Sequence, residues 1–264
     1  MDFLEFERID SPINFKMNEP HSHEHFEIYY LLDGTRHFFI NDKMLVIEKD
    51  TLIVIPPFSL HKTEGGPYLR ININVSPSLL NQEQIDTLNK IAQKTAIKVN
   101  GKYHKLIKEL LIEGANVQDM NVKNKNEYLL SILKTIILFL SIERLNTISA
   151  VSTAGNIKNT TPEVLKIIYY INTHYDRQIS LKTLCDMFFL SKVSLCKKFK
   201  EVMNCSIMEY LLRVRLNTAK SLLRSTNKSV EQISIECGFS SANYFGLIFK
   251  KEVGLSPLNY KKTR

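Results

Sequence analysis

Four side chains in the first quarter of the chain have the types and spacing of a ligand site. His21, His23, His25 and Glu27 share parity, so in a β-strand they would point to one face, and His61 would arrive from another strand. Imidazole and carboxylate groups bind zinc, iron, nickel or manganese. The same groups also form hydrogen bonds with a small organic effector. A third interpretation makes them structural polar residues at the mouth of a barrel.

Tyr29 and Arg36 add hydrogen-bonding groups that suit a polyol or a carboxylate, although a register shift of one residue would turn them to the other face. The residues expected at the effector site are His21, His23, Glu27, Tyr29, Arg36 and His61. No cofactor and no metal are expected. If a divalent metal does bind in the barrel, its expected ligands are His21, His23, Glu27 and His61.

The surrounding segments predict a small β-barrel or jelly roll. Apolar runs between 21 and 75 are closely spaced and end at turn signals such as Asp33-Gly34, and a hairpin loop is expected over 41–43. The 69–75 segment alternates apolar and polar residues, which is typical of a strand with one buried face.

From 81 onward the pattern becomes helical, most clearly over 127–144. One apolar stripe repeats at intervals of three and four residues, as in a coiled coil, and consists of Leu130, Leu133, Ile137 and Leu140. A second stripe lies beside it, so the helix must be covered on two sides. We expect the first stripe to form the interface of a homodimer. The alternative is a helix buried wholly within its own domain.

The last hundred residues contain one module twice. The 191–200 segment corresponds to 240–250, and 204–210 corresponds to 254–260. Each copy predicts a short helix, a tight turn and a second helix, the arrangement that places a helix in the major groove of DNA. A long helix is expected between the copies, over 207–224, and the polar segment before them predicts a linker.

The charge distribution favours a polyanionic partner for the duplicated region alone. Residues 161–264 carry 17 Lys and Arg against 8 Asp and Glu, whereas the rest of the chain carries 18 against 19. A basic domain beside a neutral one is typical of a protein that binds nucleic acid through one domain.

The cysteine pattern and the hydropathy exclude several classes of protein. The four cysteines form no C-x-x-C pair and have no histidine at zinc-finger spacing, so a structural zinc site is not expected. The most apolar stretch, 129–142, is too short to span a bilayer. No signal peptide is apparent at the N-terminus. These features predict a cytoplasmic protein with reduced thiols and no membrane partner.

The duplicated region resembles the C-terminal domain of AraC/XylS-type bacterial transcription regulators. The motifs that carry the resemblance are Ile233-x4-Gly238-Phe239-Ser240, Tyr244-Phe245-x3-Phe249-Lys250 and Gly254-x-Ser256-Pro257-x2-Tyr260-Lys261. The resemblance implies two helix-turn-helix units that enter adjacent major-groove segments. In the first copy Phe189 stands where the second has Gly238, which puts the geometry of the first turn in question.

The N-terminal half resembles the cupin-type sensor domain that many such regulators carry. His21-x-His23-x3-Glu27-x6-Gly34 is similar to the first cupin motif, and Pro56-x4-His61 to most of the second. Asp50 and Phe58 depart from the pattern, because cupins usually have glycine there.

Two reading helices are expected, over 192–202 and 241–253, with Leu195, Phe199, Phe245 and Phe249 in the core. The residues expected at DNA are Lys192, Val193, Ser194, Lys197, Lys198, Lys200, Arg215, Ala242, Asn243, Tyr244, Leu247 and Lys250. Lys197 falls where the family often places a base-reading cation, and Lys198 and Lys200 suit phosphates. The second helix lacks such a cation; Asn243 suits adenine, while Ala242 and Leu247 suit thymine methyl groups.

Together these features predict an α+β protein of two domains. The expected parts are a cupin-like β-barrel over 1–80, accessory and dimerisation helices over 81–146, a linker over 147–160, and an all-α double helix-turn-helix domain over 161–264. The expected function is that of a transcription regulator, not an enzyme. Its expected partners are double-stranded DNA, a small effector such as a sugar, a second copy of the chain, and RNA polymerase if it activates. The alternatives are a cupin metalloenzyme or metal sensor fused to a DNA-binding module, and a thiol sensor acting through Cys196.

Overall fold

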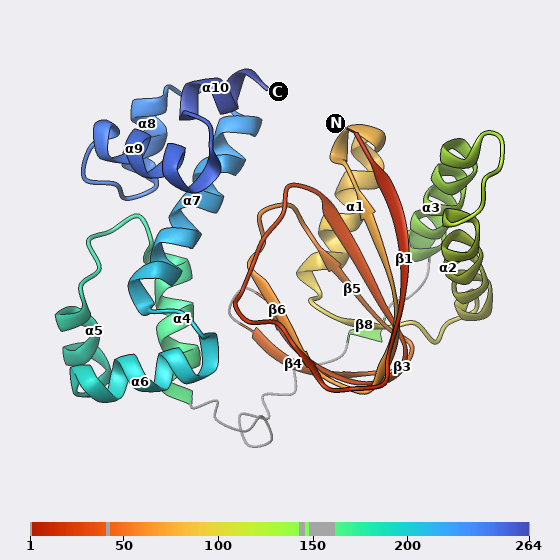
Figure 1. The fold of residues 1–264 in the computed structure, drawn as a ribbon, viewed down its shortest axis with the longest axis horizontal. Helices are drawn as coiled ribbons and strands as arrows, with labels where there is room; N and C mark the ends of the chain where they lie inside the picture. The colour runs from red at the N-terminus through yellow and green to blue at the C-terminus, as the bar shows by residue number, and fades with distance from the viewer. Residues whose placement is uncertain (1, 41–42, 143–145, 148–161, 264) are drawn as a thin grey trace. The chain divides into compact units, whose positions relative to one another are not determined.

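The computed structural model describes residues 2–40, 43–142, 146–147 and 162–263 (Figure 1). The chain divides into two compact units, one of 1–17 and 23–153 and one of 18–22 and 154–264. The first is an antiparallel β-sheet domain with helices and the second is entirely helical, so the predicted α+β class with two domains is confirmed. The predicted linker lies outside the described residues, apart from Thr147.

The N-terminal unit is built around one long strand, β3. Its strands are β1 (Leu4–Ser11), β2 (Phe15–Lys16), β3 (Phe26–Ile40), β4 (Lys43–Glu48), β5 (Thr51–Ile55), β6 (His61–Gly65), β7 (Tyr68–Val75), β8 (Ile97–Lys98) and β9 (Asn146–Thr147). β3 pairs with β7 and β5 through its first half, and with β4 and β6 through its second half. β3 therefore joins two groups of strands, and Figure 1 shows them wrapped around a common interior as a barrel.

The turn predicted at Asp33-Gly34 is wrong, because β3 continues through both residues. The register against β7 shifts between Leu31 and Asp33, which marks a β-bulge. The inward side chains are Tyr29 and Leu31 before the bulge, and Phe38 and Ile40 after it. Gly34 has φ +92, and a Cβ there would lie 2.4 Å from the carbonyl oxygen of Pro67. The glycine therefore permits a close approach of two strands and does not mark a chain reversal.

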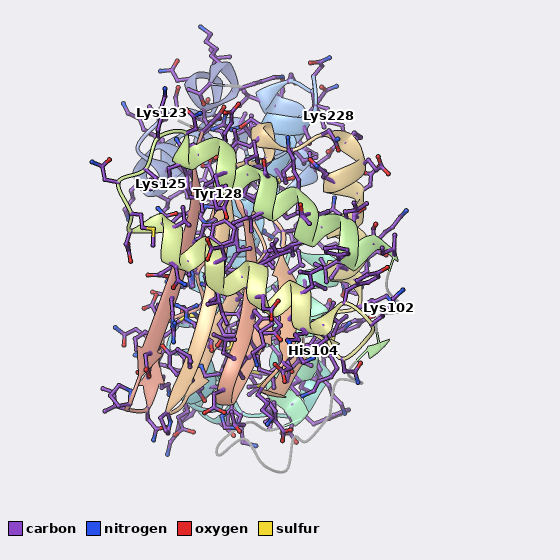
Figure 2. All side chains as sticks on the ribbon, turned by 90° about the vertical axis from the view of Figure 1, so that its right-hand side faces the viewer. Lys102, His104, Lys123, Lys125, Tyr128 and Lys228 are labelled. Carbon is purple, nitrogen blue, oxygen red and sulfur yellow. The ribbon has the colours of Figure 1, made fainter. Side chains whose placement is uncertain are left out.

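Three helices cover the outer face of the sheet: α1 (Gln82–Gln93), α2 (His104–Gln118) and α3 (Lys125–Ile142). Figure 2 shows α2 and α3 lying across the strands. The apolar core between helices and sheet includes Ile28, Ile73, Leu111 and Ile136. Even α3 is not long and apolar enough to cross a membrane, and the same holds for every other helix among the described residues.

The predicted dimerisation stripe on α3 is wrong. Leu133, Ile137 and Leu140 are at most 2% exposed and belong to the core of their own unit, and Leu130 is half-buried. A helix that closes a sheet must bury its most apolar face against that sheet, so these residues are not available to a second subunit. The alternative of burial within the domain holds for this stripe.

Asp50 and Phe58, the two departures from the cupin pattern, both adopt left-handed backbone, with φ values of 59° and 66°. The local conformation that glycine usually supplies is therefore present without glycine. The Asp50 carboxylate accepts hydrogen bonds from Tyr30 at 2.9 Å and Lys108 at 3.1 Å, and His104 lies 3.3 Å away. These contacts tie the β4–β5 turn to α2.

The C-terminal unit consists of α4 (Pro162–His174), α5 (Leu181–Phe188), α6 (Lys192–Met203), α7 (Ile207–Ser225), α8 (Val230–Glu236), α9 (Ala242–Val253) and α10 (Pro257–Lys262). Capping boxes begin α7 at Ser206 and α8 at Ser229. The N-cap of α9 is Ser241, whose hydroxyl accepts the Tyr244 amide. The two modules are therefore α5–α6 and α8–α9, joined by α7.

Candidate functional site

The helix α6 presents a basic face to solvent. Leu195 and Phe199 are fully buried, as predicted from their spacing. The opposite face exposes Lys192, Val193, Lys197 and Lys200, and Ser194 is half-buried. Because the core residues fix the rotation of the helix, these side chains can reach a polyanion without any change in packing.

The helix α9 has the same design with different chemistry. Phe245 and Phe249 are fully buried, as predicted, while Asn243, Tyr244, Leu247 and Lys250 are exposed and Ala242 is half-buried. Leu247 is 72% exposed, although nothing in the fold requires a large apolar residue at a solvent-facing position. A Cβ added to Gly246 would meet no atom within 4 Å. Close packing within the C-terminal unit therefore does not explain this glycine.

Two residues predicted at DNA have other contacts in the structure. Lys198 lies 4.0 Å from the carboxylate of Glu163 on α4 and is half-buried. Arg215 donates hydrogen bonds to the carbonyl oxygens of Tyr175 and Arg177, both at 2.8 Å. The Arg215 guanidinium therefore binds the protein's own backbone, and its assignment as a DNA contact stays a prediction.

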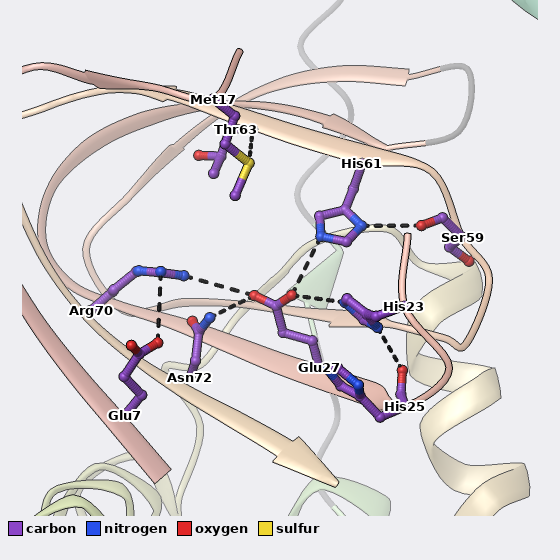
Figure 3. A network of polar contacts seen from close by, with 10 residues as sticks. All are labelled: Glu7, Met17, His23, His25, Glu27, Ser59, His61, Thr63, Arg70 and Asn72. Carbon is purple, nitrogen blue, oxygen red and sulfur yellow. Dashed lines mark hydrogen bonds and ion pairs between the residues drawn. The ribbon is translucent and has the colours of Figure 1, made fainter. Parts of the chain in front are cut away.

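A buried polar network inside the barrel centres on Glu27 (Figure 3). The carboxylate lies 3.1 Å from Nε2 of His23 and 3.4 Å from Nε2 of His61. The structure thus brings together three of the predicted effector residues from the start of β3, the preceding loop and β6. His21 lies in the 18–22 segment, which groups with the helical unit, and its side chain is exposed.

Sequence reasoning missed Arg70 and Asn72, which extend this network along β7. Arg70 lies 3.7 Å from Glu27 and 4.0 Å from Glu7, and the Asn72 amide donates to Glu27 at 2.6 Å. The alternation of the 69–75 segment already placed both residues on one face. Only the pairing of β7 with β3, which sets Asn72 opposite Tyr29, shows that this face is the interior.

Tyr29 and Arg36 both lie in the barrel interior, with different accessibility to a ligand. The Arg36 guanidinium donates to the hydroxyl of Thr63 and to the carbonyl oxygens of Phe15 and Gly65. It is 1% exposed, so the prediction of Arg36 as an effector contact is corrected to a residue of the barrel wall. The buried Tyr29 hydroxyl makes no hydrogen bond with the described residues. Burial raises the pKa of Tyr29 to about 12, against the opposing charges of Arg70 and Arg36.

The network controls the protonation of its acidic centre. Burial acts to raise the pKa of Glu27, but hydrogen bonds from His23 and His61 outweigh it and hold that pKa below its ordinary range. Nearby His25 has its pKa lowered to about 4, by burial and then by the charge of His23. Glu27 is therefore ionised at neutral pH, and His25 is neutral.

The donor atoms around Glu27 fit a divalent metal in part. Nδ1 of His23 lies 2.9 Å from the His25 carbonyl oxygen, and Nδ1 of His61 lies 3.0 Å from that of Ser59. Such backbone contacts orient the ring of a metal ligand and leave Nε2 to the metal. Against a cation, Arg70 already places a positive charge beside the same carboxylate. Within the first unit, His23, Glu27 and His61 are the residues that would hold such an ion.

Comparison with known proteins assigns a family to each half. Residues 4–110 match the model of the AraC-like ligand binding domain, and residues 184–263 match a helix-turn-helix domain model. Together the two matches cover more than half of the chain. The chain belongs to the AraC family of DNA-binding transcription regulators.

Relatives include the HTH-type transcriptional activator RhaR of Mannheimia succiniciproducens, 26% identical over 91% of this chain and 86% of the relative. The activator RhaS of Enterobacter sp. (strain 638) is 30% identical over 43% of this chain, but the match spans only 41% of RhaS. The C-terminal domain of AraT from Geobacillus stearothermophilus is a similar solved structure. It is 30% identical, with a TM-score of 0.39, over 39% of this chain and 87% of that domain.

We predict that Glu27→Gln destabilises this AraC-family protein in a pH-dependent way. The lowered pKa of Glu27 means that the ionised carboxylate stabilises the fold above its unfolded pKa, and that this stability is lost as the pH falls toward the folded pKa. Urea unfolding at neutral pH should show a loss of roughly 3 kcal/mol. The difference in the free energy of unfolding between Glu27→Gln and wild type should become smaller as the pH falls below about 4.5.

The matched control is Glu7→Gln, because Glu7 is half-exposed and touches the same Arg70 at 4.0 Å. It should change the free energy of unfolding by less than about 1 kcal/mol. A Glu27→Gln difference that stays constant with pH would contradict the assigned ionisation.

Proposed function

We propose that this protein is a one-component transcription regulator whose barrel binds a small effector and whose helices α6 and α9 read successive major-groove segments. The observation that carries the proposal is the duplicated module, in which each second helix buries two core residues and leaves a polar or basic face open. Relatives are transcriptional activators, and we propose a non-enzymatic, cytoplasmic protein with RNA polymerase as a partner when it activates.

The two helices are proposed to read DNA by different chemistry. Lys197 projects from the middle of α6, where a lysine can contact guanine O6 and N7. On α9, Asn243 suits adenine, and the exposed Leu247 suits thymine methyl groups. The open space beside Gly246 allows the DNA backbone or a base edge to approach closely. Lys192, Lys200 and Lys250 are proposed to contact phosphates.

Lys197→Ala should weaken binding to the cognate operator by about 1–3 kcal/mol and relax preference at one base pair. The loss follows from the removal of a base contact. Electrophoretic mobility shifts on the operator and on random DNA measure the specific and the non-specific affinity.

The control is Lys198→Ala, which removes the same charge from the next residue of the same helix. Because Lys198 turns toward Glu163, this variant should leave base preference unchanged. An equal loss for Lys197→Ala on operator and random DNA would instead identify a phosphate contact.

The effector is proposed to bind beside the Glu27 network. Three buried polar atoms there, the Tyr29 hydroxyl, Nε of Arg70 and Oδ1 of Asn72, have no hydrogen-bond partner among the described residues. Buried groups of this kind are costly unless a ligand or water satisfies them. Two negative charges, on Glu7 and Glu27, balance two positive charges, on Arg36 and Arg70. This balance favours a neutral, hydroxyl-rich effector such as a sugar.

A thermal-unfolding screen of the full chain against sugars, organic acids and divalent metals tests this site. A ligand at a hundred times its dissociation constant should stabilise the protein by about 2.7 kcal/mol. Tyr29→Phe should leave the ligand-free stability nearly unchanged, since the lost hydroxyl is unpaired, and should reduce the ligand-induced shift.

The alternative ligands give different results in the same screen. A shift with a metal alone, abolished by His23→Ala, would favour a metal sensor. A sugar shift that Tyr29→Phe leaves intact would place the effector elsewhere.

A homodimer is proposed through the outer face of α3, in place of the buried stripe. Tyr128, Leu138 and Ile142 are 48%, 59% and 56% exposed, and with Ser131 and Thr135 they repeat at intervals of three and four residues. A groove beside this stripe is lined by Glu83 of α1 and Lys134 of α3, among others. Opposite charges at the rim suit a two-fold interface, in which each patch meets its own copy.

Leu138→Glu should convert the dimer to a monomer, because it places a charge at the centre of the proposed apolar seam. Sedimentation equilibrium of the full chain measures the change. The control is Leu106→Glu, an exposed leucine of α2 outside the stripe, which should remain dimeric. A dimer that survives Leu138→Glu would rule out this face.

A further inference from the structure

The two modules of the C-terminal unit meet at one arginine. Arg215, in the middle of α7, donates from Nε to the carbonyl oxygen of Tyr175 and from Nη2 to that of Arg177, both at 2.8 Å. These acceptors lie in the loop that follows α4, on the side of the first module. The same guanidinium lies over the ring of Phe239, with Cζ 6.0 Å from the centroid. Phe239 belongs to the core of the second module.

The turn of the second module presses against the same loop. Gly238 has φ +75, and a Cβ there would lie 2.5 Å from the carbonyl oxygen of Tyr175 and 2.8 Å from the backbone of Asp176. No side chain fits at this distance. The 175–177 loop, Arg215 and the Gly238–Phe239 turn therefore form one contact, called here the clamp, that joins the modules in addition to α7.

Among the residues that the structure describes, the equivalent turn of the first module makes no such contact through its side chain. Phe189, which corresponds to Gly238, also has left-handed backbone, with φ 54°, yet its side chain is 94% exposed. A left-handed turn is thus common to both copies, but close approach occurs only in the second. This difference explains why one copy contains glycine and the other tolerates phenylalanine.

We propose that Arg215 is a positioning residue that fixes the separation and relative rotation of α6 and α9, and thereby the base-pair spacing that the protein accepts. The inference rests on the proposed reading of DNA by these two helices. One base pair changes the separation of two sites by about 3.4 Å and their relative rotation by about 34°. A rigid pair of helices therefore fits one spacing, whereas a pair held by α7 alone tolerates neighbouring spacings.

The test measures spacing preference with the full-length protein. The operator is first obtained by selection from random DNA with wild-type protein, and variants of it with one base pair inserted or deleted between the two contacted segments are then prepared. Wild type should lose about tenfold or more in affinity at each altered spacing. Arg215→Ala should lose affinity for the parent operator and show less than about threefold further loss at the altered spacings.

Arg215→Lys separates positioning from DNA contact. Lysine keeps the positive charge but lacks the planar fork that reaches two carbonyl groups. It should behave like Arg215→Ala in the spacing series. Gly238→Ala should also flatten the spacing preference, since its Cβ would push the turn from the loop. Circular dichroism and thermal unfolding establish that each variant is folded.

The matched control is Arg224→Ala on the same helix. Arg224 lies over the ring of Tyr260 at 4.7 Å and donates to the Thr263 carbonyl oxygen, so these two contacts join α7 to the C-terminal end of the second module. This variant should keep the wild-type spacing preference.

Two results would overturn the clamp while leaving the proposed function intact. One is a spacing penalty in Arg215→Ala and Arg215→Lys equal to that of wild type. The other is a uniform loss on all DNA that Arg215→Lys restores, which would identify a phosphate contact. Failure of the proposed function looks different, because wild type itself would then select no operator or would show no spacing penalty.

Discussion

Burial of both faces of the first half of β3 is the constraint on which the N-terminal unit depends. Over 26–32 one face packs against the helices and the other lines the barrel, so every residue of this half is committed to one side or the other. At the bulge after Leu31 the inward-facing residues change from odd-numbered to even-numbered positions. This change lets one strand pair with both groups of strands. Because Glu27 and Tyr29 precede the bulge, they face the interior with Arg70 and Asn72 of β7. The candidate effector site is thus a consequence of strand pairing.

The polar network in the barrel combines groups that are satisfied with groups that are not. Glu27 contacts four side chains, and hydrogen bonding outweighs the cost of its burial. The neighbouring Tyr29 hydroxyl and Asn72 oxygen are buried without a hydrogen-bond partner in the part of the chain that the structure describes. A stable ionic centre beside unpaired polar atoms is a physical basis for ligand binding, since the centre keeps its shape while the unpaired atoms gain a partner.

In the C-terminal unit, duplication produced two similar modules with different surroundings. Both second helices bury a pair of large residues four apart and expose the opposite face. The modules differ in charge, with lysines on α6 and Asn243 and Leu247 on α9. They differ also in their turns, because Gly238 lies against the 175–177 loop and Phe189 lies in solvent. The repeat thus supplies two similar helices with an exposed face, and the contacts between the modules set the separation and relative rotation of these helices.

The sequence by itself determined the local features: the double module, its caps, the helical core residues and the strand-rich first half. Each depends on spacing within about ten residues, which periodicity and capping chemistry record directly. Only the tertiary structure decided which face each element buries. It buried Leu133 and Ile137 within one domain, directed Arg215 to backbone carbonyl groups, and brought Arg70 and Asn72 to Glu27. The role of a side chain depends on contacts with residues distant in the chain. One bulge, or one close approach of two strands as at Gly34, changes those contacts, and the local sequence pattern does not clearly indicate it.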